Sequence, residues 1–158
     1  MRRGEEEGRV PRPYMEKAMR NVEAEEAFVK AFILLDKRER YLQMLGSPRK
    51  RGKILNSLYH TLDCVPALTT AIPSREHSEV RVIALLRAKG AGAACYLISP
   101  ELDLDQQEMP LQEAVARMIV QDRTAIACCL PGRLAYYKAE LSGYVLEGPL
   151  APEGRASR

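Results

Sequence analysis

The residues best suited to chemistry in this chain are cations that crowd into one short segment. Between Lys37 and Lys53 the sequence reads KRERYLQMLGSPRKRGK, with seven Lys and Arg residues against the single acid Glu39. The segment therefore carries a charge of about +6 in a chain whose total charge is +3. Ammonium and guanidinium groups at this density attract phosphate and carboxylate groups. The sequence predicts a surface that binds nucleic acid or an acidic protein partner.

The same segment is predicted to fold as a helical hairpin. Gly46 can end one helix, while Ser47 and Pro48 can begin the next. The second helix would run to about Leu62, would carry a polar stripe along one face, and would direct its first amides toward an anion. The predicted anion-binding residues are Lys37, Arg40, Arg49, Lys50, Arg51, Lys53 and His60.

Simpler interpretations of these residues stand beside the first. Charge runs on helices commonly form a solvated face that deters aggregation. His60 could act as a general acid or base toward a phosphate, or it could be an exposed histidine that pairs with Asp63 three residues on. No second candidate base is linked to His60 by spacing, so we identify no catalytic residues. The sequence favours a binding or adaptor protein over an enzyme.

A second group of charges lies in the acidic segment PELDLDQQEM, residues 100–109. Its carboxylates at Asp103, Asp105 and Glu108 are oxygen ligands of the kind that Mg²⁺ prefers. They define the alternative function, a small metal-dependent hydrolase or nuclease that uses residues 101–108, with Lys138 or His60 completing the chemistry. The segment lacks the turn glycine and final glutamate of a calcium-binding loop. An acidic surface loop is the competing interpretation, and we expect no cofactor.

Composition limits the remaining classes of protein. With 46% hydrophobic and 28% charged residues, the chain has the composition of a soluble globular protein. Its longest apolar runs, near residues 31–35 and 82–86, are far shorter than the ~20 residues that cross a bilayer, so we expect no membrane partner. The first residues lack the apolar stretch of a secretory signal, and the four cysteines lack the paired spacings of zinc or redox sites. The expected location is the cytoplasm.

The pattern of elements predicts an α+β fold. Three helices are expected in the N-terminal half, over residues 14–45 (as one helix or two nearly continuous ones), 48–62 and 74–89. About four strands follow, at 93–99, 124–130, 133–141 and 144–147. The unit from Ala93 to Leu130 is predicted to be a right-handed β-α-β crossover between parallel strands. An antiparallel meander would complete a small mixed sheet.

The ends of the chain differ from its middle. Residues 1–13 and 148–158 mix charged residues, Gly and Pro without periodicity, which predicts a disordered N-terminal arm and a flexible tail. Residues 14–147 are predicted to form a single α+β domain. A homodimer that pairs the last strand, expected to be an exposed edge, or the long first helix is compatible with either function.

Overall fold

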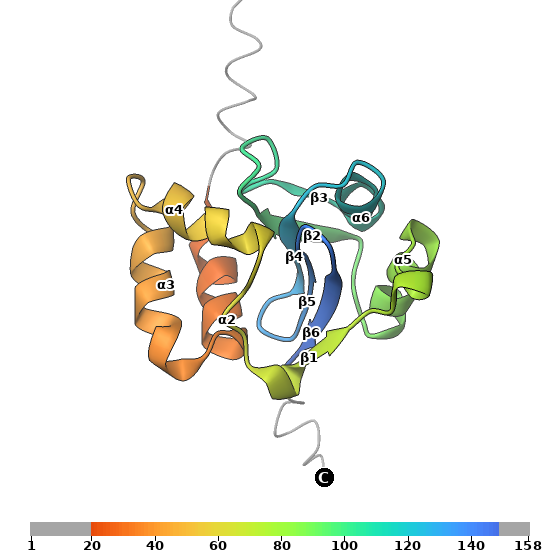
Figure 1. Ribbon diagram of the computed structural model, residues 1–158, viewed down its shortest axis with the longest axis horizontal. Coiled ribbons are helices and arrows are strands. Elements are labelled where there is room, and N and C mark those ends of the chain that lie inside the picture. Colours follow the sequence, from red (N-terminus) through yellow and green to blue (C-terminus); the bar gives the residue numbers. More distant parts are fainter. Residues whose placement is uncertain (1–19, 149–158) are drawn as a thin grey trace, which may run out of the picture.

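The computed structural model describes residues 20–148, which form a six-stranded sheet between two layers of helices (Figure 1). One layer consists of α2, α3 and α4, and the other of α5 and α6. None of the described helices is long and apolar enough to cross a membrane. The predicted α+β class is confirmed. The helices are α2 (Val22–Phe32), α3 (Arg38–Leu45), α4 (Arg51–Asn56), α5 (Glu79–Ala88) and α6 (Leu111–Ile119), with 3-10 turns at η1 (Leu35–Lys37), η2 (Ser57–Tyr59), η3 (Pro66–Leu68) and η4 (Ser74–Glu76).

Some sequence-based predictions concern residues that the structure does not describe. The predicted arm at 1–13 and the start of the first helix at 14–19 lie outside the described residues. The same holds for the predicted tail except Gly148, whose amide donates to the carbonyl of Arg133 at 2.9 Å.

All neighbouring strands of the sheet are antiparallel. Their spatial order is β1-β6-β5-β4-β2-β3. The predicted meander is confirmed, because β4, β5 and β6 pair in succession. The prediction of a mixed sheet with a parallel β-α-β crossover is wrong. The strands are β1 (Thr69–Ala71), β2 (Ala94–Ile98), β3 (Glu108–Pro110), β4 (Ala125–Leu130), β5 (Leu134–Lys138) and β6 (Gly143–Glu147).

The sequence did not predict β3, and this explains why β2 and β4 were predicted to be parallel. β3 returns antiparallel to β2 before α6 begins, so the chain has already reversed when the helix starts. α6 then leads into β4, which pairs antiparallel with β2 and places Tyr96 opposite Cys128. Three residues that include a glutamate and a proline give no alternating apolar signal. β1, with the sequence TTA, is equally short and likewise gives no alternating apolar signal.

The last strand is also placed differently from the prediction. β6 lies between β5 and β1, and β1 covers it through the pairs Thr69 with Leu146 and Ala71 with Tyr144. The edges of the sheet are therefore β1 and β3. A homodimer that adds a second chain to an exposed β6 is incompatible with this arrangement.

The segment predicted as one helix or two nearly continuous ones, residues 14–45, contains two helices in its described part, α2 and α3. Asn21 caps α2 by accepting a hydrogen bond from the amide of Ala24 at 3.0 Å. After Phe32 the backbone becomes extended, and the fully buried Ile33 forms a β-bridge with Cys64. This tertiary pairing overrides the helical propensity of the segment, and the chain becomes helical again through η1 into α3.

The next two helices begin later than predicted. Ser47 closes a turn, with its carbonyl accepting from the amides of Lys50 and Arg51, and α4 starts only at Arg51. α4 is six residues long and continues as a 3-10 turn, so the predicted polar stripe from residue 49 to 63 does not lie on one helix. α5 is capped by Ser78 rather than by Ser74.

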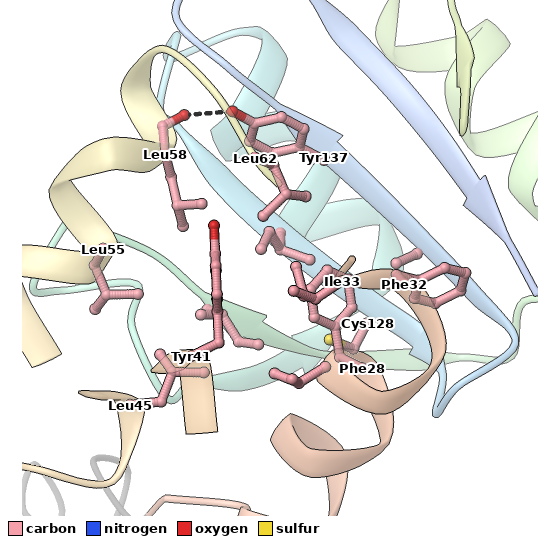
Figure 2. Packing of buried hydrophobic residues seen from close by; sticks show 14 of the residues in the cluster. Phe28, Phe32, Ile33, Tyr41, Leu45, Leu55, Leu58, Leu62, Cys128 and Tyr137 are labelled. Carbon is pink, nitrogen blue, oxygen red and sulfur yellow. Dashed lines mark hydrogen bonds between the residues drawn. The ribbon is translucent and has the colours of Figure 1, made fainter. Parts of the chain in front are cut away.

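The core has two parts, one on each face of the sheet. Strand residues alternate between them, so that Tyr96 faces α2 while Cys95 and Leu97 face α5 and α6. Figure 2 shows the first part, where aromatic and aliphatic side chains of the helical hairpin pack on the sheet. There the Tyr137 hydroxyl donates to the carbonyl of Leu58 at 2.6 Å, which satisfies a buried polar group. Coverage of both faces accounts for the nearly continuous apolar strands in the sequence.

A close contact under the loop before α5 depends on a glycine. His77 lies 2.5 Å from the hydroxyl of Tyr136, a side chain with no exposed surface. Burial, followed by the nearby charge of Lys138, lowers the pKa of His77 and favours its neutral ring. A Cβ atom on Gly143 would lie 2.4 Å from Nε2 of His77. Gly143 thus leaves the space that the imidazole needs to reach Tyr136.

We predict opposite effects of alanine at two glycines. Gly143→Ala should displace His77, leave the buried Tyr136 hydroxyl without its partner, and lower the free energy of unfolding by about 1–3 kcal/mol. Gly52→Ala should raise it by about 0.5–1 kcal/mol, because Gly52 lies in α4 and its added Cβ would meet nothing within 4 Å. Urea denaturation followed by circular dichroism measures both. Unchanged stability in the Gly143 variant would contradict this account of the contact.

Candidate functional site

The helical hairpin divides the basic segment into two groups. Lys37 and Arg40 lie at the start of α3, whereas Arg49, Lys50 and Lys53 lie beyond its other end. Figure 1 shows α3 running between these two ends. An eight-residue helix is about 12 Å long, so cations that are neighbours in the sequence form two separate surface groups rather than one.

The larger group forms what we call the cationic corner, defined by Arg49, Lys50 and Lys53. All three residues are exposed, in the turn after α3 and the first turn of α4. None of them forms an ion pair with another residue of the range 20–148. The corner therefore presents three positive charges to solvent, and no acid among residues 20–148 is paired with them.

Arg51, in contrast, lies in the interior of the protein. Only 7% of its surface is exposed. All five of its N–H groups donate: Nε to Asp105 at 2.8 Å, Nη1 to Glu25 at 3.0 Å and to the carbonyl of Leu45 at 2.9 Å, and Nη2 to Glu25 at 2.7 Å and to Asp105 at 3.0 Å. A guanidinium has five such donors. The prediction that Arg51 belongs to the exposed anion-binding surface is therefore wrong.

The two carboxylates around Arg51 are themselves held by further donors. Glu25, with no exposed surface, also accepts from the Tyr96 hydroxyl at 2.7 Å and from Nε of Arg20 at 2.6 Å. Asp105 accepts from the amide of Ser99 at 3.0 Å. The network joins α2, α4, β2 and the acidic loop, so the helical hairpin is fastened to the sheet by charge as well as by apolar packing.

Hydrogen bonding decides the ionisation of this network. Burial raises the pKa of Glu25, but the bonds from Arg51, Tyr96 and Arg20 outweigh it and hold that pKa below the ordinary value of 4.5. Burial lowers the pKa of Arg51, and its bonds to Asp105 and Glu25 outweigh that effect and raise it. Glu25 and Arg51 are therefore both charged at neutral pH.

The buried arginine also sets the direction of the cationic corner. Successive residues of an α-helix are rotated by about 100°, so Lys53 points away from the side of α4 on which Arg51 is buried. Lys50 precedes Arg51 directly, and Arg49 belongs to the exposed turn before it. Because Arg51 fixes the start of α4 against Glu25 and Asp105, its neighbours are held outward on an ordered support.

The carboxylates of the acidic segment do not come together. Asp105 is bound to Arg51, Asp103 pairs with Arg123, and Glu108 is exposed on β3. Within residues 20–148, no group of three or more His, Cys, Asp or Glu side chains is arranged to hold a metal ion. Two of the predicted metal ligands, Asp103 and Asp105, are thus each paired with a different arginine, and the third, Glu108, is exposed on β3.

Two other predicted residues also lie elsewhere. His60 follows η2, at the opposite end of the α4–η2 segment from the cationic corner, with its Nδ1 3.5 Å from Oε1 of Glu140. Lys138 is buried on β5, where it donates to Asp122 at 2.7 Å and to the carbonyl of Ala139 at 3.2 Å. Neither residue joins the acidic segment to form a catalytic group.

One signal of the buried network was present in the sequence. Glu25 lies three, four and seven residues before Phe28, Val29 and Phe32, on the apolar face of α2. A charge at that spacing indicates a buried acid that needs a cation. The sequence does not show which of the seven cations of the basic segment pairs with Glu25, because that choice depends on tertiary packing.

Comparison with known proteins adds no relative from which a role can be transferred. No protein-family model, curated protein or solved structure matches this chain. The function must therefore be argued from the geometry of the cationic corner and the network beneath it. That arrangement offers charge and hydrogen-bond donors to an anion.

We predict that loss of the buried arginine is costly and that loss of an exposed cation on the same helix is not. Arg51→Met leaves Glu25 and Asp105 buried without their main partner and should lower the free energy of unfolding by about 3–5 kcal/mol. Lys53→Met is the matched control and should change it by no more than about 0.5 kcal/mol. Chemical denaturation of both variants checks this, and equal effects would contradict the assigned role of Arg51.

Acid should weaken the protein through Glu25. Because its folded pKa lies below the unfolded value of 4.5, ionised Glu25 contributes stability above that value. The contribution is lost as the pH falls below 4.5 and through the folded pKa. Unfolding free energies measured between pH 7 and pH 3 should therefore fall in the acidic part of the range. Glu25→Gln should flatten that fall, and an unaltered profile would show that other groups cause it.

Proposed function

We propose that this protein is a non-enzymatic binding or adaptor protein that contacts the phosphate backbone of a nucleic acid through the cationic corner. The observation that carries the proposal is the outward display of Arg49, Lys50 and Lys53 without neutralising partners among the described residues. Lys and Arg supply most of the sequence-independent affinity for nucleic acids. The ordered support under the corner reduces the entropy lost on binding.

The surroundings of the corner favour phosphate over an acidic protein. Protein interfaces are anchored by apolar and aromatic side chains that become buried on binding. Among residues 20–148 none of the large exposed hydrophobic residues belongs to α4 or to the turn before it; they are Val22, Leu35, Val80, Leu102, Val120 and Leu141. Exposed polar residues flank the corner instead, with Gln43 on α3 and Asn56 on α4. Side chains of these types donate to phosphate oxygens and carry no base preference.

The number of cations in the corner sets the expected strength of nucleic-acid binding and its dependence on salt. Three phosphate contacts give a salt dependence of about −2.7 in log K against log salt on duplex DNA, and about −2.1 on single strands. Raising the salt concentration from 50 to 200 mM should then weaken duplex binding roughly 40-fold. Such binding is modest, which suits an adaptor better than a sequence-specific regulator.

The alternative, a metal-dependent hydrolase or nuclease, has less support. It needs Asp103, Asp105 and Glu108 to share one ion, and two of these three carboxylates are paired with arginines of the fold. The binding function requires no group that the fold already uses.

A charge-matched comparison tests the proposal. Replacing Arg49, Lys50 and Lys53 with Ser should reduce the salt slope by about 2–3 and weaken binding to duplex DNA and to RNA. The control replaces Arg75, Arg81 and Arg87 with Ser, three exposed arginines around α5 on the other side of the sheet. It removes the same net charge and should leave the slope nearly unchanged. Fluorescence anisotropy over a series of salt concentrations measures both.

Three results would count against the proposal. If the two triple variants weaken binding equally, net charge and not the corner is responsible. If the intact protein binds neither DNA nor RNA at 50 mM salt, the nucleic-acid assignment fails. Retention from a lysate that survives nuclease treatment but is lost in the corner variant would identify an acidic protein as the partner instead.

A further inference from the structure

A pocket on the hairpin side of the sheet lies away from the cationic corner and takes no part in the proposed function. Its volume is about 190 Å³. It opens beside the loop that follows η2, with β1, β5 and β6 beneath it. The residues that line it are His60, Thr61, Leu62, Cys64, Thr69, Tyr137 and Tyr144.

The floor of this pocket is rigid. Tyr137 and Tyr144 stack with ring centroids 5.7 Å apart and planes 17° from parallel. The Tyr137 hydroxyl donates to the carbonyl of Leu58, and the Tyr144 hydroxyl accepts from Ser142 at 2.9 Å. Both rings are therefore fixed before any ligand arrives, and Figure 2 shows Tyr137 and Leu62 at the edge of the packed core.

The wall opposite the tyrosines is fixed by backbone and side-chain bonds. Cys64 is held by its β-bridge to Ile33, and the Thr69 hydroxyl, whose oxygen lies 3.3 Å from the Cys64 sulfur, can donate to the carbonyl of Val65 at 2.9 Å. At the mouth, His60 and Thr61 are exposed, and Nδ1 of His60 lies 3.5 Å from Oε1 of Glu140. A preformed floor with an exposed polar mouth is the usual plan of a small-molecule site.

The lining also defines the charge and shape of the ligand. None of the seven residues is Lys, Arg, Asp or Glu, so a charged ligand would leave water without gaining a counter-charge from the lining. Parallel aromatic rings favour a flat ligand that packs against their faces or edges. The imidazole of His60 and the hydroxyl of Thr61 can hydrogen-bond to polar substituents, and the hydroxyl oxygen of Thr69 can accept a hydrogen bond.

We infer that this pocket binds an uncharged aromatic ring compound that carries a hydrogen-bonding substituent. Its size agrees with that class, because a cavity of about 150 Å³ holds benzene, while drug-sized ligands require about 300 Å³ or more. One ring with an amide or hydroxyl group fills the available space. The site is independent of the cationic corner, so either assignment can fail without the other.

Three probes of similar size test the chemistry of the pocket. Benzamide is aromatic and uncharged, cyclohexanecarboxamide keeps the amide without the aromatic ring, and benzoate keeps the ring with a charge. Benzamide should bind with a Kd on the order of 1 mM. Cyclohexanecarboxamide should bind about 2- to 10-fold more weakly, and benzoate at least about 10-fold more weakly. Titrations of the full chain by NMR give the three constants.

Cys64 lines the pocket, so the reactivity of its thiol can report whether a ligand occupies the site. The other three cysteines are buried, and burial raises the pKa of each thiol, to about 12 for Cys129. Iodoacetamide should therefore modify Cys64 first, since the thiolate is the reactive form and access is required. Saturating benzamide should slow that modification several-fold, as measured by mass spectrometry.

Two variants with a matched control locate the binding. Thr61→Trp at the exposed mouth should fill the pocket and reduce benzamide affinity at least 10-fold without disturbing the core. Thr70→Trp places the same side chain on an exposed β1 residue that lines a different pocket, and it should leave the affinity unchanged. Tyr144→Leu should weaken benzamide 2- to 10-fold while leaving cyclohexanecarboxamide unaffected.

Several outcomes would overturn the inference. Benzoate binding as tightly as benzamide would show that the pocket does not select against charge. If cyclohexanecarboxamide bound as tightly as benzamide, the two tyrosine rings would contribute no preference for an aromatic ligand. Benzamide that neither shifts resonances nor protects Cys64 at 10 mM, or that binds unchanged to the Thr61→Trp variant, would show that the pocket is not a site for this class of ligand.

Discussion

The fold depends on a guanidinium that is enclosed by two carboxylates in the interior. Removing charges from water is expensive, and the cost is recovered only when every donor and acceptor finds a partner. Arg51 meets that condition with five donated hydrogen bonds, two of them to each of Glu25 and Asp105. Since Glu25 lies on α2 and Asp105 follows β2, the bond network fixes how the hairpin sits on the sheet.

The same network separates structural charge from surface charge. Of the cations between Lys37 and Lys53, one is used inside the protein, and its immediate neighbours are held outward at the cationic corner. The surface that we assign to nucleic acid is thus a consequence of how α4 is anchored. The aromatic pocket belongs to the opposite end of the α4–η2 segment and is built by the sheet, so the two proposed sites rest on different parts of the core.

Local sequence patterns predict the strands that are covered by helices on both faces of the sheet. The apolar runs of β2 and β4 are expected within a few residues of their positions. Strand direction was not predicted, because it depends on β3, whose three residues carry no period. The site was predicted only in part. Sequence spacing shows which side chains are charged, but which of them is desolvated by a distant acid such as Glu25 is decided by packing.

The two edge strands of the sheet affect how readily molecules of this protein would aggregate at high concentration. The outermost strands are only three residues long; β3 ends at Pro110, and Pro73 follows β1 by two positions. A proline cannot donate to an incoming backbone, and so short an edge offers few amides to a neighbour. Neither edge of the sheet formed by residues 20–148 therefore offers a long row of amides to a second molecule, and the aliphatic strands at the centre of the sheet are covered on both sides by neighbouring strands.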